Sequence, residues 1–351
     1  MLLITLRDLQ WRRRRFAIAV AVTSMVLGLA LLLSGVSASF TNEADRTLEL
    51  IHVDAWLVRS GDATPFTGPS AVDAGAASAV ASIQGVEAAS PIIVTSATAR
   101  LEGSVRNVNV IGVVPGGVGD PTAIDAGSSV ILSGDALVDT SLGLERGEGL
   151  RLAGHSTRVV GLVRGITYFA GIPTVFLPIW DVQQMRFGGE PLATAIVTWG
   201  FPREAPAGLE ILSGDEVRED VLRPVAQARQ TIALIRGLLW IVAAGIVGAI
   251  VYMSALERTG DFAVMKAAGA ANRSLLSGLL VEAVVLASAS AGMAILLEAA
   301  MAPLAAMSVE VPASAYATLP AVALLMGGIA SAAALRRTIR VEPALAFGSP
   351  S

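Results

Sequence analysis

Cysteine is absent from the 351-residue sequence, which excludes several kinds of site. Without thiols the chain has no disulfide framework, iron–sulfur cluster, cysteine-ligated zinc or cysteine nucleophile. Lysine is almost absent too, because Lys266 is the only one. A phosphate-cradling P-loop needs Gly-Lys-Ser or Gly-Lys-Thr, whereas Lys266 stands between Met265 and Ala267. The chain therefore has no ATPase of its own.

Charged residues make up only 15% of the sequence and aromatic residues 5%, whereas the apolar set reaches 54%. Typical globular domains hold about 25% charged residues. Together with a mean hydropathy of +0.66, this composition excludes a disordered chain and argues for a protein of the lipid bilayer. The one large polar segment, Ser37 to Gln230, is acidic, with 13 Arg against 22 Asp and Glu. That balance argues against nucleic acid as a partner.

Four stretches meet or approach the length of about 20 apolar residues that a membrane-spanning helix needs. Short flanking segments on one side collect 11 basic residues against four acidic ones, and such flanks face the cytoplasm. We therefore expect a multi-pass protein of the cell membrane with both termini cytoplasmic. The expected order is a cytoplasmic amphipathic segment (1–15), a first span (16–36), an extracytoplasmic domain with stalk helices (37–231), a second span (232–256), a cytoplasmic loop (257–274), a third span (275–297), a short outer loop (298–315), a fourth span (316–335) and a cytoplasmic tail (336–351).

The first span has an alternative interpretation as a cleaved signal peptide, because Val36-Ser37-Ala38 resembles a small-residue cleavage site. Its apolar stretch of 21 residues, Phe16 to Val36, exceeds the usual length of about 7 to 15 residues in a signal peptide. The chain before it begins with an amphipathic segment, in which Leu2, Leu6 and Leu9 share one helical face, and this also favours a membrane helix. No helix-breaking residue stands between Val36 and Leu48, so we expect the helix to continue outward. Likewise, apolar positions at helical spacing before the second span predict one long helix from about Asp215, which Pro224 could kink.

The fold class that we predict is an α-helical membrane protein with four transmembrane helices. One α+β extracytoplasmic domain is inserted between helices 1 and 2, because strand and helix patterns interleave there. Strands are expected at 53–58, within 92–114, at 150–152, 157–163, 174–177 and 195–199. Short helices are expected at 70–83, 134–142 and 181–185.

Isolated polar residues give few candidate sites. His52 and His155 lie far apart in the sequence, and ordinary surface histidines explain them better than a metal site. Glu282 lies in the first third of the third span, where an ionisable residue calls for a functional explanation. It is either a substrate or proton site or a hydrogen-bonding group inside the helix bundle.

The cytoplasmic loop is the most informative segment. Phe262, Met265 and Gly269 share one helical face, Asp261 favours the helix start, and Gly269 or Asn272 suits its end. This pattern predicts a short helical knob with Phe262 and Met265 exposed. The alternative is a helix that lies flat on the membrane.

This loop resembles the signature of FtsX-like permeases. An acidic–basic pair, Glu257-Arg258, precedes Asp261-Phe262-Ala263-Val264-Met265-Lys266-Ala267-Ala268-Gly269-Ala270. The segment 134–163 is similar to the outer core domain of MacB-type permeases, and the order of spans and domain is similar over nearly the whole chain. The resemblance implies that an ATPase subunit contacts the loop through Glu257, Arg258, Asp261, Phe262, Met265, Lys266, Gly269 and Arg273.

The resemblance also implies a function. The chain would be the permease subunit of an ABC complex, a homodimer that couples ATP hydrolysis to export or extraction at the outer face by mechanical transmission. It would have no catalytic site, metal or cofactor of its own, with ATP and Mg²⁺ bound by the separate ATPase, and an extracytoplasmic adaptor could deliver substrate. The alternative is an FtsX-like regulator of a cell-wall hydrolase that transports nothing. The sequence does not specify the substrate.

Overall fold

The structure is a computed structural model that describes residues 13–61, 63–101, 103–267, 269, 272–301 and 310–318 and the single residues 322, 325, 328 and 329; for 261–263, 266 and 272–276 it describes the backbone only. The chain divides into two compact units. The first, called the helical unit below, comprises residues 1–39 and 228–351, and the second, the outer domain, comprises residues 40–227.

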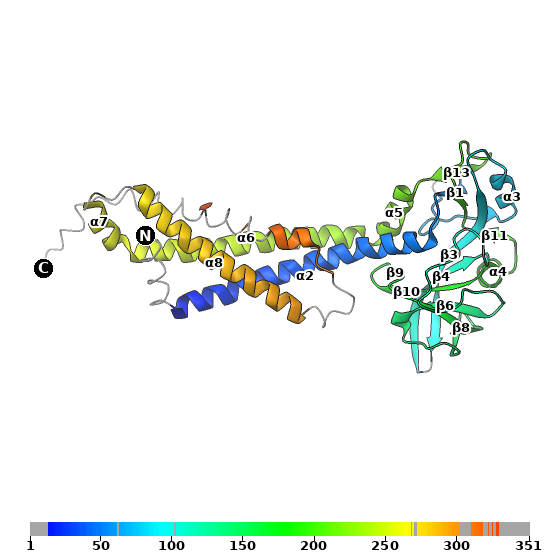
Figure 1. The fold of residues 1–351 in the computed structure, drawn as a ribbon, viewed down its shortest axis with the longest axis horizontal. Coiled ribbons are helices and arrows are strands. Elements are labelled where there is room, and N and C mark those ends of the chain that lie inside the picture. Colours follow the sequence, from blue (N-terminus) through cyan, green and yellow to red (C-terminus); the bar gives the residue numbers. More distant parts are fainter. Residues whose placement is uncertain are drawn as a thin grey trace. The chain divides into compact units, whose positions relative to one another are not determined.

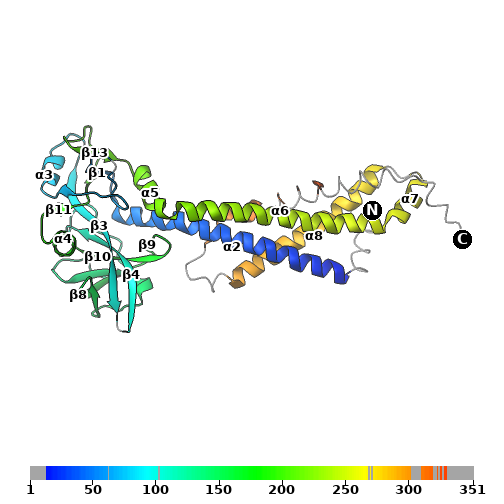
Figure 2. The ribbon, with the colours of Figure 1, turned by 180° about the vertical axis from the view of Figure 1, so that it is seen from behind.

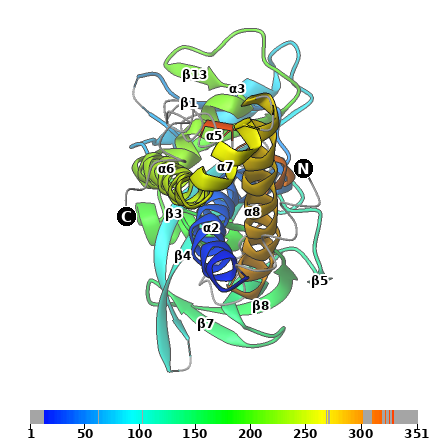
Figure 3. The ribbon, with the colours of Figure 1, turned by 90° about the vertical axis from the view of Figure 1, so that its left-hand side faces the viewer.

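The helical unit contains long apolar helices. Helix α2 runs over Arg13–Ile51, α6 over Ala226–Glu257, α7 over Thr259–Ala267 and α8 over Asn272–Met301. Figure 3 shows α2 and α6 close to end-on, whereas α8 runs from top to bottom of the view; the short α7 lies next to α6. Among the described residues, three helices are long and apolar enough to cross a membrane, namely Arg13–Ile51, Gly214–Glu257 and Ser277–Met301. The first two expected spans fall within them, the third, 275–297, begins two residues before Ser277, and most of the fourth, 316–335, lies outside the described residues.

Two predictions about these helices are confirmed. Helix α2 continues past Val36 as far as Ile51, because no helix-breaking residue interrupts it. A continuous helical run also begins at Gly214 and ends at Glu257. Within it, the 3-10 turn η2, Arg223–Val225, contains Pro224 and separates α5, Gly214–Leu222, from α6. The proline lacks the backbone N–H that a regular α-helix needs there, so the expected irregularity lies at the proline.

The outer domain is built on a mixed sheet of 11 strands in the order β13-β1-β12-β3-β4-β10-β6-β8-β5, with β7 and β9 off this path (Figure 1). A second, two-stranded sheet joins β11 and β2. The strands are β1 (Ala55–Arg59), β2 (Val72–Asp73), β3 (Ala88–Leu101), β4 (Ser104–Val113), β5 (Ala126–Gly127), β6 (Asp135–Asp139), β7 (Gly149–Leu152), β8 (His155–Val163), β9 (Thr167–Tyr168), β10 (Ile172–Pro178), β11 (Leu192–Ala193), β12 (Ala195–Trp199) and β13 (Leu209–Leu212).

Six of these strands form a closed ring of pairings. Strand β3 pairs β4, β4 pairs β10, β10 pairs β6, β6 pairs β8, β8 pairs β7, and β7 pairs β3 again. The pairs β4/β10 and β6/β8 are parallel and the others are antiparallel. Closure leaves these strands few unpaired edges. The fully buried side chains of Val110, Val138, Leu152 and Val175 belong to one core cluster contributed by this ring.

Two short helices lie next to the sheet, α3 (Ala76–Ala81) and α4 (Ile179–Phe187) (Figures 1 and 2). Helix α4 comes very close to β4, because a Cβ built on Gly112 would lie 2.9 Å from the Cβ of Val182. At the start of α5, Ser213 and Glu216 form a capping box, which satisfies backbone N–H groups that the helix leaves open.

Most expected elements of the outer domain are confirmed. Residues 195–199 form β12, and residues 181–185 lie inside α4. Strands β7 and β8 form the expected hairpin, which turns at Ala153-Gly154, one residue before the expected Gly154-His155. The helix expected at 134–142 is wrong. Residues 135–139 form β6, between β8 and β10, and only the last three residues, Thr140–Leu142, form a 3-10 turn. The helix expected at 70–83 is shorter than predicted, because β2 occupies part of it.

Candidate functional site

The loop between α6 and α8 is packed onto one end of the helical unit. A cluster of buried apolar side chains joins the three long helices there, with Ala19 from α2, Val247 and Val251 from α6, and Leu279 and Ala283 from α8. Met265 of α7 is partly buried and packs against this cluster. Small and β-branched side chains allow the helices to approach closely, and α7 is held to the same core by Met265.

The short helix α7 presents a different surface from the one expected. The sequence predicts an exposed Met265, but its side chain packs inward, and the adjacent Val264 is the one exposed, at 65%. The helix pattern places these neighbours on different faces. The side chains of Asp261, Phe262, Lys266 and Arg273 lie outside the described residues. Gly269 follows α7 with φ of 88°, the left-handed conformation that commonly ends a helix.

The two residues of the acidic–basic pair that precedes α7, Glu257 and Arg258, contact different helices. Glu257 accepts a hydrogen bond from Arg15 of α2, with both side chains about one-third exposed. Arg258 Nη1 lies 3.7 Å from Glu282 Oε2 of α8, and these two side chains are each 11% exposed. The two adjacent residues therefore connect the end of α6 to α2 through one ion pair and to α8 through the other.

Arg258, one of the residues that the resemblance assigns to the ATPase contact, is buried against α8. A buried charge without an opposite charge is very costly, and the pairing with Glu282 offsets that cost for both residues. Among the two explanations for Glu282, this contact supplies a partner inside the bundle.

The sequence analysis does not identify Arg15 as a residue of this site. It belongs to the basic run Arg12 to Arg15, which predicts only the orientation of the first span. Its contact with Glu257 joins positions 242 residues apart, and no local pattern encodes such a pairing. A second polar contact is found where α8 ends, between Tyr316 Oη and Glu298 Oε2 at 2.9 Å.

These features define a membrane protein that combines apolar helices with an α/β domain. Residues 233–343 match the family described as FtsX-like permease C-terminal. The chain belongs to the ABC transporter permeases, in the FtsX-like, MacB-type group. It is 41% identical over 350 residues to the ABC transporter permease Rv2563 of Mycobacterium tuberculosis, and 38% identical over 350 residues to the permease Rv0072 of the same organism; each alignment covers 100% of both chains.

Two solved structures are similar in part. The extracellular domain of the noncanonic ABC-type transporter YknZ from Gram-positive bacteria aligns with 46% of this chain and 100% of its own length, at 12% identity and a TM-score of 0.34. The periplasmic region of MacB from Actinobacillus actinomycetemcomitans aligns with 51% of this chain and 97% of its own length, at 9% identity and a TM-score of 0.35.

Proposed function

We propose that this permease couples ATP hydrolysis in a separate ATPase subunit, which binds ATP and Mg²⁺, to export or extraction of a substrate at the outer face. The ATPase docks on the cytoplasmic loop 257–274, and the resulting movement passes along α2 and α6 to the outer domain. Two copies of the chain form the membrane part, and an adaptor outside the membrane delivers or receives substrate. In this topology both termini are cytoplasmic.

The observation that carries this proposal is that α7 and the residues before it contact all three long helices of the helical unit. Glu257 connects the loop to α2, Arg258 connects it to α8, and Met265 packs into the core of the same bundle. Closely packed groups have low compressibility and transmit a displacement. A push on α7 therefore moves three helices together.

Helix length supports the same mechanism. Helix α2 has 39 residues and the run Gly214–Glu257 has 44, which correspond to about 58 and 66 Å at 1.5 Å per residue. The hydrocarbon core is only about 30 Å thick. Each helical run is therefore about twice as long as the hydrocarbon core is thick, which supports transmission of a movement along the helix.

The absence of cysteine gives a direct test. A single cysteine placed at Glu49, an exposed position on the outer part of α2, takes an environment-sensitive dye without background labelling. In proteoliposomes with the ATPase, trapping with ATP and vanadate should shift the dye emission, and an ATPase without its P-loop lysine should give no shift. An unchanged emission under trapping, while the permease still stimulates hydrolysis, would refute transmission through α2.

A further inference from the structure

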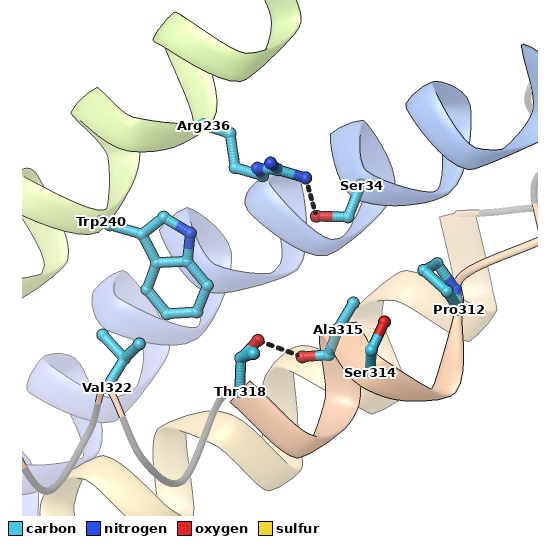
Figure 4. A pocket seen from close by; sticks show the side chains of 8 residues that line it. All are labelled: Ser34, Arg236, Trp240, Pro312, Ser314, Ala315, Thr318 and Val322. Atoms are coloured by element: carbon cyan, nitrogen blue, oxygen red, sulfur yellow. Dashed lines mark hydrogen bonds between the residues drawn. The ribbon is translucent and has the colours of Figure 1, made fainter. Parts of the chain in front are cut away.

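A pocket of about 400 Å³ lies within the helical unit, away from the loop that holds α7 (Figure 4). Helix α6 contributes Arg236 and Trp240, α2 contributes Ser34, and the remaining wall comes from the chain after α8. The residues of that wall are Pro312, Ser314, Ala315, Thr318 and Val322. The pocket therefore combines one guanidinium and one indole ring with hydroxyl and apolar groups.

Arg236 provides the positive charge of the pocket. Among the described residues its hydrogen bond is to Ser34 Oγ, at 3.4 Å, and no carboxylate pairs with it. An arginine stays charged at every physiological pH and has five N–H donors. Most of these donors are therefore open to a ligand.

The Arg236 side chain lies on the buried face of α6 and not on the face exposed to lipid. Trp240, Ala243 and Val247 follow it on one helical face, and the last two are 0% and 1% exposed. Leu238 and Ile241, on the other side of α6, are 61% and 69% exposed. Arg236 thus lies on the face of α6 that packs against the bundle, and Figure 4 shows its guanidinium directed at Ser34.

The hydrogen bonds already made by the pocket hydroxyls indicate which groups a ligand must carry. Ser34 and Thr318 donate their hydroxyl hydrogens to the carbonyls of Ala30 and Ala315. Ser34 and Thr318 are therefore acceptors in the pocket. Arg236, Ser314 and the indole N–H of Trp240 remain as donors, so a ligand with acceptor oxygens and negative charge fits better than a cation or a neutral sugar.

The position along the helix identifies the source of that negative charge. Arg236 lies four residues inside the expected span 232–256, about 6 Å from its outer end. At this depth tryptophan and arginine meet lipid headgroups. We propose that the pocket binds the phosphate of an anionic membrane amphiphile. Arg236 holds the phosphate oxygens, and Trp240 and Val322 contact the apolar part next to the headgroup. With about 400 Å³, the pocket holds a headgroup and leaves the acyl chains in the bilayer.

Trp240 makes the binding measurable in the full-length protein. Nanodiscs would contain either brominated phosphatidylglycerol or brominated phosphatidylcholine, since bromine quenches tryptophan fluorescence at contact. The signal of Trp240 is the difference between the wild type and Trp240→Phe. In the wild type, quenching by phosphatidylglycerol should saturate at a lower mole fraction than quenching by phosphatidylcholine. Equal titration curves for the two lipids would overturn the proposal.

Variants distinguish specific binding of the lipid phosphate by Arg236 from nonspecific attraction of anionic lipids to positive charge. Arg236→Gln should weaken the apparent affinity for phosphatidylglycerol about tenfold, the effect of losing a charge-assisted hydrogen bond, and Arg236→Lys should retain part of it. Arg14→Gln, which removes an exposed charge elsewhere in the helical unit, should leave the affinity unchanged. If Arg236→Gln binds like the wild type, or if Arg14→Gln weakens binding equally, the pocket does not select the lipid.

A final arm distinguishes a lipid from a soluble anion. Millimolar inorganic phosphate should not displace brominated phosphatidylglycerol if the apolar contacts contribute to binding. Displacement by free phosphate would refute the lipid and assign the pocket to a soluble phosphate compound. None of these measurements uses ATP or the ATPase, so their outcome is independent of the coupling mechanism.

Discussion

Arg258 and Glu282 form a buried ion pair between the end of α6 and the first half of α8, with Nη1 and Oε2 3.7 Å apart. In water such a contact contributes little, but here each side chain is only 11% exposed. Removing one partner from a buried pair deprives the remaining charge of that attraction, whereas replacing both with apolar groups can be neutral. The pair therefore fixes which parts of the two helices meet.

Separate replacement of each partner should give a large loss of stability. Arg258→Met and Glu282→Leu are each expected to reduce the free energy of unfolding by about 3 kcal/mol, and the double variant should recover most of that loss. Urea unfolding of the purified protein in detergent measures all four corners of this cycle. Additive losses in the double variant would contradict a direct pairing.

The pair of Arg15 and Glu257 provides the matched comparison. Its side chains are 33% and 40% exposed, so solvent screens the attraction, and Arg15→Ala should cost less than about 1 kcal/mol. The same urea experiment measures it. A loss as large as that of Arg258→Met would mean that burial is not what distinguishes the two pairs.

The proposed membrane topology predicts that Gly85 and Gly269 lie on opposite sides of the membrane. Reporter fusions at Gly85, in the outer domain, and at Gly269, after α7, should report opposite sides of the membrane because basic flanks stay in the cytoplasm. Alkaline phosphatase and green fluorescent protein fusions distinguish the two compartments. Activity of the same reporter at both positions would refute the proposed topology.

A buried carboxylate holds a loop of the outer domain to α5. Asp220 is 1% exposed and accepts hydrogen bonds from the backbone N–H groups of Phe66, at 2.8 Å, and Thr67, at 3.3 Å, and from the Thr67 hydroxyl. Asp220→Ala leaves these donors without an acceptor and should cost about 3 kcal/mol. Urea unfolding followed by tryptophan fluorescence measures the loss, because Trp56 packs 5.6 Å from the Phe66 ring.

The exposed Glu219 is the control for that substitution. It is adjacent in sequence but on the solvent side of α5, so Glu219→Ala should change the free energy of unfolding by no more than about 0.5 kcal/mol. Equal effects of the two substitutions would show that the loss comes from helix propensity or charge and not from the bonds to Phe66 and Thr67.

Several elements could be predicted because their signals are local. The apolar run of α2 lacks any breaker, and Pro224 accounts for the 3-10 turn η2. Gly154-His155 predicts the hairpin of β7 and β8, which turns one residue earlier, at Ala153-Gly154. Each prediction depends on residues that are neighbours in the sequence. This is why the helices and most of the longer strands lie close to where they were expected.

Other features depend on partners far away in the sequence. Residues 135–139 have no alternation of apolar and polar side chains because β6 is buried between β8 and β10, and a short run of this kind cannot be distinguished from a helix by periodicity. The same limit applies to the loop. Met265 packs inward and Arg258 reaches Glu282 because of the positions of α2 and α8, which the loop sequence does not contain.

The stiffness of α6 should matter for transmission and not for assembly. Ala228→Gly with Gln230→Gly alters two exposed positions and should lower helix stability by about 2 kcal/mol, since each glycine costs about 1 kcal/mol. We expect normal assembly and ATPase stimulation, but a smaller dye response at Glu49→Cys. Ala228→Ser with Gln230→Ala, which keeps better helix formers, is the control. A full dye response in the glycine variant would mean that α6 is only a tether.

Stimulation of the ATPase subunit by the permease tests the central claim most directly. Val264 is exposed on α7 while Met265 packs into the bundle, so Val264→Asp should insert and fold like the wild type. Burying its carboxylate at an apolar contact would cost several kcal/mol. We predict that permease-dependent ATPase activity is lost in Val264→Asp and retained in Val264→Ala, measured in the same proteoliposomes. Full stimulation by Val264→Asp, with normal folding, would contradict docking of the ATPase on α7.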